Sequence, residues 1–343
     1  MRPFYKNLLF SFFYITTNIC TAQDVNLSQF YELPLLRNPA LAGLFVGDVR
    51  VISAYRNQWK SVTSSYQTKA LSAEMKFSAG QNSFDFFTVG LQLSNDLAGE
   101  SRLSKTQIMP ALNFHKSING NDDSYISAGV IAGPVQHSFD PSNLNFNDQF
   151  VNGNYNAANP TMQSIMSSNL IYWDVAAGIS FSSVVAENIH YYVGLGLFHI
   201  TKPTVGFMAA NDVQLNRKVV LNVGVTMPTG IEEDKIIVYA DYFAQGGVKQ
   251  LQGGFLYHHD MIVYTQEEKV AIAGGIFYRW NDAIIPVVKL NYYNLGMGVS
   301  YDLNVSKLAV ASGVRGGMEL TLSYKNYLNV KSSSINKTRC PKF

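Results

Sequence analysis

The sequence is poor in charged residues, in cysteine and in long apolar runs, and each shortage excludes a class of protein. Charged residues make up 15% of its 343 residues, against roughly 25% in soluble globular domains, which argues against an ordinary cytosolic enzyme. The formal net charge is +2, so there is no basic excess for binding nucleic acid. After residue 22, no run reaches the roughly 18 apolar residues of a transmembrane helix. Mean hydropathy near zero also excludes a helical membrane protein with several spans.

The first 22 residues have the parts of a secretory signal peptide. Two basic residues precede an apolar stretch from Leu8 to Ile15, and small residues at Cys20 and Ala22 precede the expected cleavage site. An N-terminal membrane helix would need about 20 apolar residues, and polar residues 16–18 end the run too early. We therefore predict export, with cleavage after Ala22.

The chain has two cysteines, Cys20 and Cys340. Cys20 would carry the lipid of a lipoprotein, but Ile19 stands before it, where a small residue is usual. Cleavage after Ala22 removes Cys20 and leaves Cys340 alone. The mature chain would then form no intrachain disulfide bond, although export would allow one.

Apolar and non-apolar residues alternate with a period of two through the rest of the sequence. In 295–302, for example, Leu295, Met297 and Val299 alternate with glycine and serine. This alternation predicts half-buried strands whose second face is small or polar. The fourteen predicted strands are 47–57, 66–78, 84–96, 103–117, 123–136, 173–184, 189–199, 217–227, 234–244, 248–259, 269–280, 283–293, 294–303 and 316–327.

An even number of antiparallel strands, each with about 10 residues in the membrane, can close into a transmembrane barrel. The two longest connections, 137–172 and 200–216, fall on one side, as expected of external loops opposite short periplasmic turns. A soluble β-sandwich alternates as well. Its outer faces would carry charge, however, whereas the non-apolar faces here are mostly Gly, Ser, Asn and Tyr. We predict an all-β fold: a transmembrane outer-membrane β-barrel of about 14 antiparallel strands over residues 47–327.

Motifs of enzymes and metal sites are not found: there is no nucleophile elbow, zinc-protease motif, phosphate loop, dinucleotide fingerprint or cysteine pair. His258 and His259 would point to opposite faces of a strand, so we expect a strand-end turn there rather than a metal site. By parity Glu319 should face the lumen and pair with an arginine or lysine, because an unpaired buried charge is unfavourable. We predict no catalytic residue, cofactor or metal, although barrel enzymes that assemble their sites across strands escape such a scan.

Irregular strings of polar and aromatic residues stand near both ends of the chain and in its longest loop. The Asn38-Pro39 step favours a turn, and the segment 23–46 would lie in the periplasm or fold into the barrel mouth. Arg56 would be a lumenal charge and Trp59 an interfacial anchor. The strings are Ser28-Gln29-Phe30-Tyr31, Asn38-Pro39-Ala40-Leu41-Ala42-Gly43, Tyr55-Arg56-Asn57-Gln58-Trp59, Asn145-Phe146-x-Asp148-Gln149-Phe150, Ser300-Tyr301-Asp302, Glu319-Leu320-x-Leu322-Ser323-Tyr324 and Cys340-Pro341-Lys342-Phe343.

In their order and spacing, these strings resemble the PorP/SprF family of type IX secretion system outer-membrane proteins over essentially the whole mature chain. Met318 departs from the resemblance, since a His is expected before Glu319. The resemblance implies a barrel in the outer membrane of a Gram-negative bacterium that is not an enzyme. It implies a role in secretion or surface attachment of cargo proteins with a C-terminal signal domain, in some members gliding adhesins.

The resemblance also implies partners: outer-membrane lipid, the C-terminal domains of secreted cargo, and periplasmic or outer-membrane components of the secretion machinery. We expect the external loops 137–172 and 200–216 to bind cargo. The periplasmic segment 23–46 and the tail 328–343 would contact periplasmic components. Two alternatives stay open: a diffusion channel or small-solute transporter, since fourteen strands can enclose an open lumen, and a barrel that only anchors another secretion component.

Overall fold

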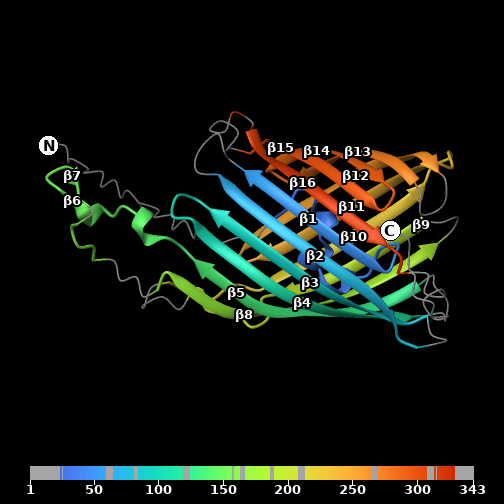
Figure 1. Cartoon of the computed structure of the whole chain (residues 1–343), viewed down its shortest axis with the longest axis horizontal. Coiled ribbons are helices and arrows are strands. Elements are labelled where there is room, and N and C mark those ends of the chain that lie inside the picture. The colour runs from blue at the N-terminus through green and yellow to red at the C-terminus, as the bar shows by residue number, and fades with distance from the viewer. Residues whose placement is uncertain are drawn as a thin grey trace, which may run out of the picture.

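The computed structural model describes residues 24, 26–58, 65–80, 84–118, 124–156, 158–162, 167–185, 189–207, 213–263, 269–306, 313 and 315–328. Fourteen antiparallel strands form one closed barrel (Figure 1). The predicted signal peptide 1–22, Trp59 and Cys340 lie outside the described residues.

Each barrel strand pairs with its neighbour in chain order, and β1 pairs with β16 to close the ring. Two further strands, β6 (Phe150–Val151) and β7 (Asn154–Tyr155), form a separate small sheet. The barrel strands are β1 (Val49–Gln58), β2 (Tyr66–Ser78), β3 (Phe86–Ala98), β4 (Leu103–Ser117), β5 (Ser124–Ser138), β8 (Asn169–Val185), β9 (Ile189–Phe198), β10 (Lys218–Pro228), β11 (Asp234–Gln245), β12 (Val248–Val263), β13 (Lys269–Arg279), β14 (Ala283–Tyr292), β15 (Leu295–Asn304) and β16 (Arg315–Asn326).

The predicted strands correspond one to one with these fourteen, which confirms the predicted fold class. The largest boundary differences are at β8, which begins four residues earlier than predicted, at Asn169, and at β12, which continues to Val263. His258 and His259 therefore lie inside a strand, and the turn predicted for them was wrong. As parity requires, His258 is buried, whereas the side chain of His259 is 46% exposed.

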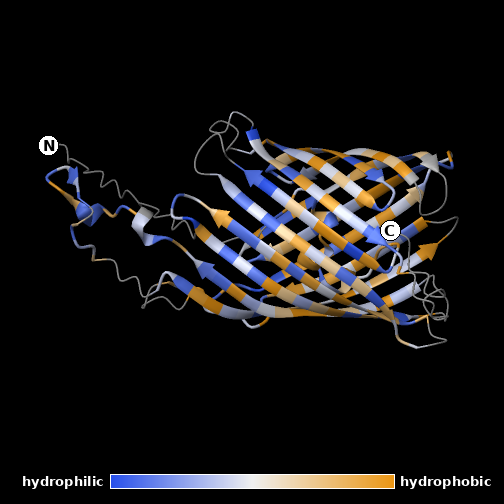
Figure 2. Cartoon of the chain, viewed as in Figure 1, coloured by the Kyte–Doolittle hydropathy of each residue, from blue (hydrophilic) through white to orange (hydrophobic). Residues whose placement is uncertain are grey.

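Apolar and polar residues alternate along the barrel strands that face the viewer in Figure 2. In β15 the outward residues Leu295, Met297 and Val299 are exposed, whereas Gly298 and Ser300 are buried. An apolar outer face of this extent is expected of a barrel that meets lipid. Among the described residues, no helix is long and apolar enough to cross a membrane.

Three prolines stand inside barrel strands: Pro110 in β4, Pro134 in β5 and Pro286 in β14. We expected bulges or misplaced strand ends at such residues, because proline cannot donate a ladder hydrogen bond. That expectation was wrong. The pairing of β4 with β5 skips residues 108–110 and then resumes in the same register, and β14 with β15 skips 285–286 in the same way.

The two ends of the barrel differ in their connections. At one end, which we call the long-loop mouth, lie the connections 139–168 and 199–217 and the ends of β1, β13 and β15. The loop that carries β6 and β7 projects from this end, on the left of Figure 1. The opposite end, the short-turn mouth, holds the start of β1 and the end of β16.

Candidate functional site

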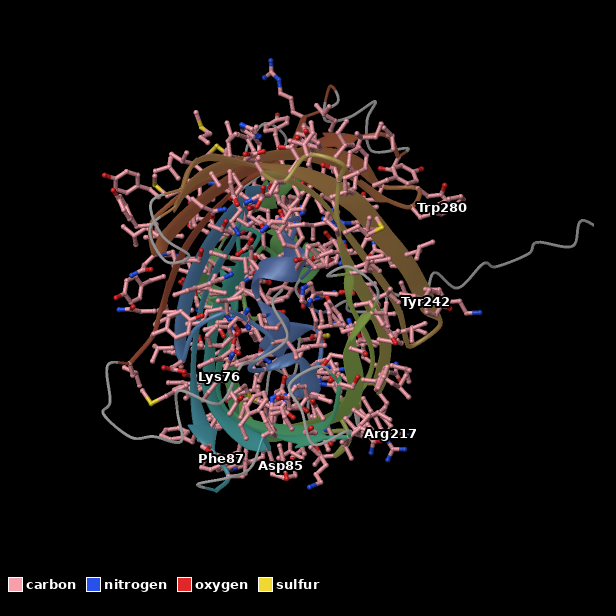
Figure 3. The ribbon with its side chains drawn as sticks, turned by 90° about the vertical axis from the view of Figure 1, so that its right-hand side faces the viewer. Lys76, Asp85, Phe87, Arg217, Tyr242 and Trp280 are labelled. Carbon is pink, nitrogen blue, oxygen red and sulfur yellow. The ribbon has the colours of Figure 1, made fainter. Side chains whose placement is uncertain are left out.

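Residues 26–46, which we call the lumenal segment, lie inside the barrel. Figure 3 looks along the barrel and shows this blue segment enclosed by the ring of strands. It forms three short 3-10 helices, η1 (Phe30–Glu32), η2 (Pro34–Leu36) and η3 (Pro39–Leu41). We predicted that this segment lies in the periplasm or folds into the barrel mouth. The structure instead places it inside the barrel. The physical reason is burial: Leu33, Leu35 and Ala40 are fully buried here and would be left in water outside the barrel.

The lumenal segment crosses the barrel from one mouth to the other. At the long-loop mouth, Asp24 lies 2.8 Å from Lys105 Nζ and 2.7 Å from His199 Nε2. At the short-turn mouth, the Lys76 ammonium donates to the carbonyl of Phe45, and the backbone N–H of Asp48 donates to Asn326 over 2.8 Å. The chain therefore enters the first strand only after it has passed through the lumen.

The charge of Asp24 anchors the start of the lumenal segment at the long-loop mouth. Burial alone would raise the pKa of its carboxyl, but Lys105, Lys218 and His199 outweigh burial and hold that pKa well below its ordinary value. The ionised carboxylate is therefore the stable form at neutral pH.

Glu319 receives the chain next. The backbone N–H groups of Ser28 and Gln29 donate to its two carboxylate oxygens over 2.7 and 2.8 Å. Glu319 is 1% exposed, and Arg56 Nη1 lies 3.6 Å from its Oε2. The prediction that Glu319 faces the lumen and pairs with a basic residue is confirmed.

Asp302 completes this arrangement with two arginines. Its carboxylate lies 2.7 Å from Arg56 Nη2 and 3.1 Å from Arg279 Nη1, and it accepts a hydrogen bond from the Ser28 hydroxyl. We call Arg56, Arg279, Asp302 and Glu319 the arginine–carboxylate cluster. Its two positive and two negative charges are almost completely buried, so each charge depends on its partners.

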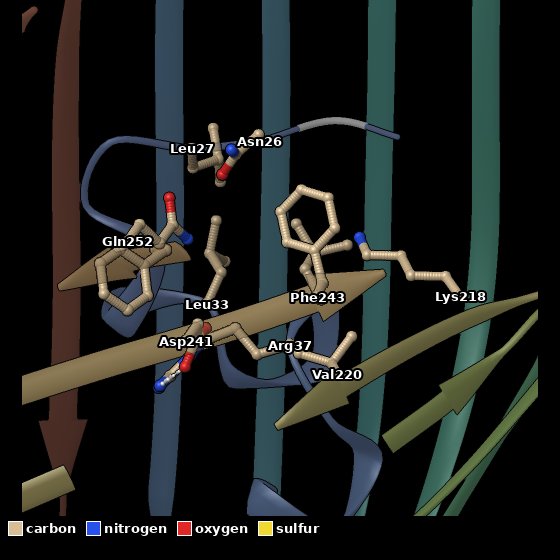
Figure 4. Close-up of a pocket in the computed structure, with 11 residues that line it drawn as sticks. Asn26, Leu27, Leu33, Arg37, Lys218, Val220, Asp241, Phe243 and Gln252 are labelled. Atoms are coloured by element: carbon tan, nitrogen blue, oxygen red, sulfur yellow. Dashed lines mark hydrogen bonds and ion pairs between the residues drawn. The ribbon is translucent and has the colours of Figure 1, made fainter. Parts of the chain in front are cut away.

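A second ion pair holds the middle of the lumenal segment. Arg37 donates to both carboxylate oxygens of Asp241 over 2.7 and 2.6 Å, as Figure 4 shows, and to the Tyr192 hydroxyl over 2.9 Å. Asn222 donates to the same carboxylate over 3.0 Å. Two parallel hydrogen bonds between guanidinium and carboxylate fix orientation as well as distance.

Asn38 and Gly43 are fitted to the barrel wall. The Asn38 side chain accepts from the N–H of Ala40 over 2.9 Å, which caps η3, and donates to the Ile179 carbonyl over 3.3 Å. A Cβ on Gly178 would lie 1.9 Å from Asn38 Oδ1. Gly43 has a φ of +86° and its N–H donates to Glu74 over 2.8 Å. Pro39 lies between these two residues in the sequence. It occupies the first position of η3 and is buried.

The remaining predicted strand residues do not join these contacts. Tyr55, Asn57 and Tyr301 occupy outward positions of β1 and β15, and Asn57 donates to the Tyr55 hydroxyl over 3.3 Å. Gln58 ends β1 at the long-loop mouth, where its side chain lies beside Gly317.

The string in the loop 139–168 is bonded within its own loop. Asp148 accepts from the N–H of Met162 over 2.6 Å and from the Thr161 hydroxyl over 3.1 Å. Gln149 accepts from the N–H of Phe146 over 3.1 Å. Asn145 is exposed, as are the apolar side chains of Phe150, Val151 and Met162 at 50%, 54% and 92%. This string is therefore separate from the arginine–carboxylate cluster.

The sequence profile of "Type IX secretion system membrane protein PorP/SprF" matches residues 19–324. The chain belongs to the PorP/SprF family. The predicted resemblance is thus confirmed, and the chain is a membrane barrel with a role in type IX secretion. A comparison with curated proteins finds no match.

Solved structures align with this PorP/SprF chain at low identity and with TM-scores below 0.5. CdiB from Acinetobacter baumannii aligns at 8% identity and a TM-score of 0.38, over 81% of this chain and 60% of CdiB. An outer membrane channel from Pseudomonas putida F1 aligns at 12% identity and a TM-score of 0.41, over 88% of this chain and 99% of that one. A mutant of the TodX monoaromatic hydrocarbon channel aligns at 11% identity and a TM-score of 0.45, over 85% and 94%. The chain thus spans about three fifths of CdiB.

In this PorP/SprF chain, sequence reasoning missed Arg279, Arg37 and Asp241. Parity could have found Arg279 and Asp241, because both occupy inward positions of their strands. Arg37 could not be found in that way, since the lumenal segment has no period. Among the described residues, no group of three or more His, Cys, Asp or Glu side chains is arranged to hold a metal ion.

Proposed function

We propose that this PorP/SprF barrel attaches or passes on secreted cargo by binding the cargo's C-terminal domain at the long-loop mouth. In this proposal the mouth faces the cell surface, and the loops 137–172 and 200–216 make the contact. Loops of a rigid scaffold commonly carry recognition residues.

The observation that carries the proposal is the loop 139–168. It keeps its form through its own hydrogen bonds around Asp148 and Gln149. It also presents apolar side chains, among them Phe150 and Val151, to solvent beyond the barrel. Exposed apolar groups at a polar loop are typical of surfaces that bind another protein.

Residues 26–46 occupy the lumen with their own buried contacts, which favours a binding platform over an open channel. We further propose that the tail 328–343 contacts periplasmic components of the machinery, since β16 ends at the short-turn mouth. Conductance in planar bilayers distinguishes a binding platform from an open channel. We expect no conductance, and a steady open pore would favour the channel.

Deleting residues 145–150 tests the proposal. Cargo retention at the cell surface should be lost while the barrel stays in the outer membrane at normal levels. The control exchanges residues 229–233, a turn at the opposite mouth, for glycine and serine, and should leave retention intact. Normal retention after the loop deletion would refute the assignment of this loop.

A further inference from the structure

A cavity of about 250 Å³ opens at the short-turn mouth. Its walls are the inner faces of β11 to β16, and Tyr31 and Glu32 of the lumenal segment form its floor.

The lining of this cavity is strongly basic. Lys235, Lys289 and Lys325 line it together with His258, and Glu32 is the acidic residue among the described residues of its lining. Glu32 forms an ion pair with Lys289. Within the part of the chain that the structure describes, Lys325 has no carboxylate partner within 4.0 Å of its ammonium. Lys325 is thus a lining cation without a close carboxylate, and the low-dielectric walls around it strengthen its attraction for an anion.

We propose that this cavity binds a carboxylate side chain of an acidic peptide segment from a partner protein. The Lys325 ammonium would pair with the carboxylate, and the side-chain amides of Asn291 and Asn294 line the same space as hydrogen-bond donors. Leu256 and Tyr239 supply an apolar wall for the neighbouring side chain of the peptide.

The position of the cavity favours a peptide over a lipid headgroup. The strand residues Lys235, Lys289 and Lys325 that line it are on the inner face, whereas lipid meets the outer face of the strands. The sequence that follows Tyr327 adds four basic residues and no acidic one up to residue 343. Basic residues in that sequence would attract the same kind of acidic partner. Because this cavity lies at the opposite end from the loop 139–168, cargo retention and peptide binding can fail independently.

The test uses the full-length protein in detergent and measures fluorescence anisotropy of a labelled Leu-Asp-Glu-Leu peptide. Lys325→Gln should weaken binding about tenfold, the effect of losing one charged contact in a desolvated site. Glu32→Gln should strengthen binding, because it frees Lys289 from its present partner. The matched control is Lys116→Gln, which removes an exposed lysine near the same mouth, outside the cavity, and should change nothing.

Three results would overturn the proposal: equal binding of the uncharged Leu-Asn-Gln-Leu peptide, equal loss of affinity in the Lys116 control, or binding of inorganic phosphate or phosphatidylglycerol micelles in place of the peptide. Heat-modifiable migration in gels checks that each variant is a folded barrel. Opposite effects of Lys325→Gln and Glu32→Gln cannot arise from a general loss of folding, so they support the cavity itself.

Discussion

Neither the lumenal segment 26–46 nor the loop 139–168 contains a barrel strand. The two stretches differ in where the hydrogen-bond partners of their polar groups lie. In the lumenal segment, hydrogen bonds reach strands far away in the sequence: Ser28 and Glu319 are 291 positions apart. In the loop, Asp148 bonds to residues 13 and 14 positions away. One stretch is part of the barrel's core, whereas the other forms its own unit outside it.

This difference separates stability from recognition. Strings of both stretches take part in the family resemblance, but their chemistry differs. The buried strings, such as Ser28-Gln29 and Glu319, satisfy one another inside the protein, so little of them is left for a partner. The loop string leaves Phe150 and its neighbours exposed. Mutations in the first stretch should therefore change the barrel, and mutations in the second should change binding.

The largest expected effect is that of Arg56→Ala. It removes an arginine that pairs with both Asp302 and Glu319, and removal of one member of a buried ion-pair network costs about 3–5 kcal/mol. Urea unfolding in detergent measures this loss. The matched control is Arg217→Ala at the exposed long-loop mouth, where a change under about 0.5 kcal/mol is expected. A small effect at Arg56 would break the comparison, because the lumenal contacts would then not stabilise the barrel.

Gly129→Ala should come next, at about 1–3 kcal/mol, the usual effect of overfilling a core. A Cβ at Gly129 would lie 2.6 Å from the backbone of Pro39, so η3 must move. Gly274→Ala is the control, since a Cβ there meets nothing within 4 Å. If both variants unfold at the same urea concentration, η3 is not docked against β5.

Asp24→Asn should have a smaller effect, about 1 kcal/mol, limited to the start of the lumenal segment. The native pKa of Asp24 is held below its ordinary value of 3.8, so its stabilisation is present above about pH 4 and is lost as the pH falls through the native pKa. This loss is measured by hydrogen exchange of amides 26–31 across pH, as the ratio of the exchange rate in the variant to that in the wild type. A ratio that has already fallen to one above pH 5 would contradict the ion pairs at Asp24.

The smallest effect on the barrel is expected for Asp148→Asn, under about 0.5 kcal/mol. The same change should reduce cargo retention several-fold, because Asp148 holds Met162 and Thr161 in the loop. Retention is measured by surface labelling of cargo in cells. Loss of barrel stability on the scale of the Arg56 variant would instead show that the loop is part of the core.

Most of the fold followed from the sequence because alternation with a period of two reports directly which face of a strand is apolar. Parity also predicted correctly that Glu319 faces the lumen. Parity does not say which inward residues meet across the barrel, so the contacts of Glu319 with Ser28 and Gln29 were not predictable. The location of the lumenal segment was missed, although Leu33, Leu35 and Phe45 offered a signal: apolar residues without a period need a place to be buried.

Photocrosslinking in cells tests the central claim most directly. A photoreactive phenylalanine analogue at Phe150, which is 50% exposed, should crosslink to a secreted protein through its C-terminal domain. The same analogue at Phe45, which is fully buried in the lumen, should crosslink only within the chain. Cargo captured from position 45 but not from position 150 would contradict the account, because the cargo would then contact the lumen and not the loop.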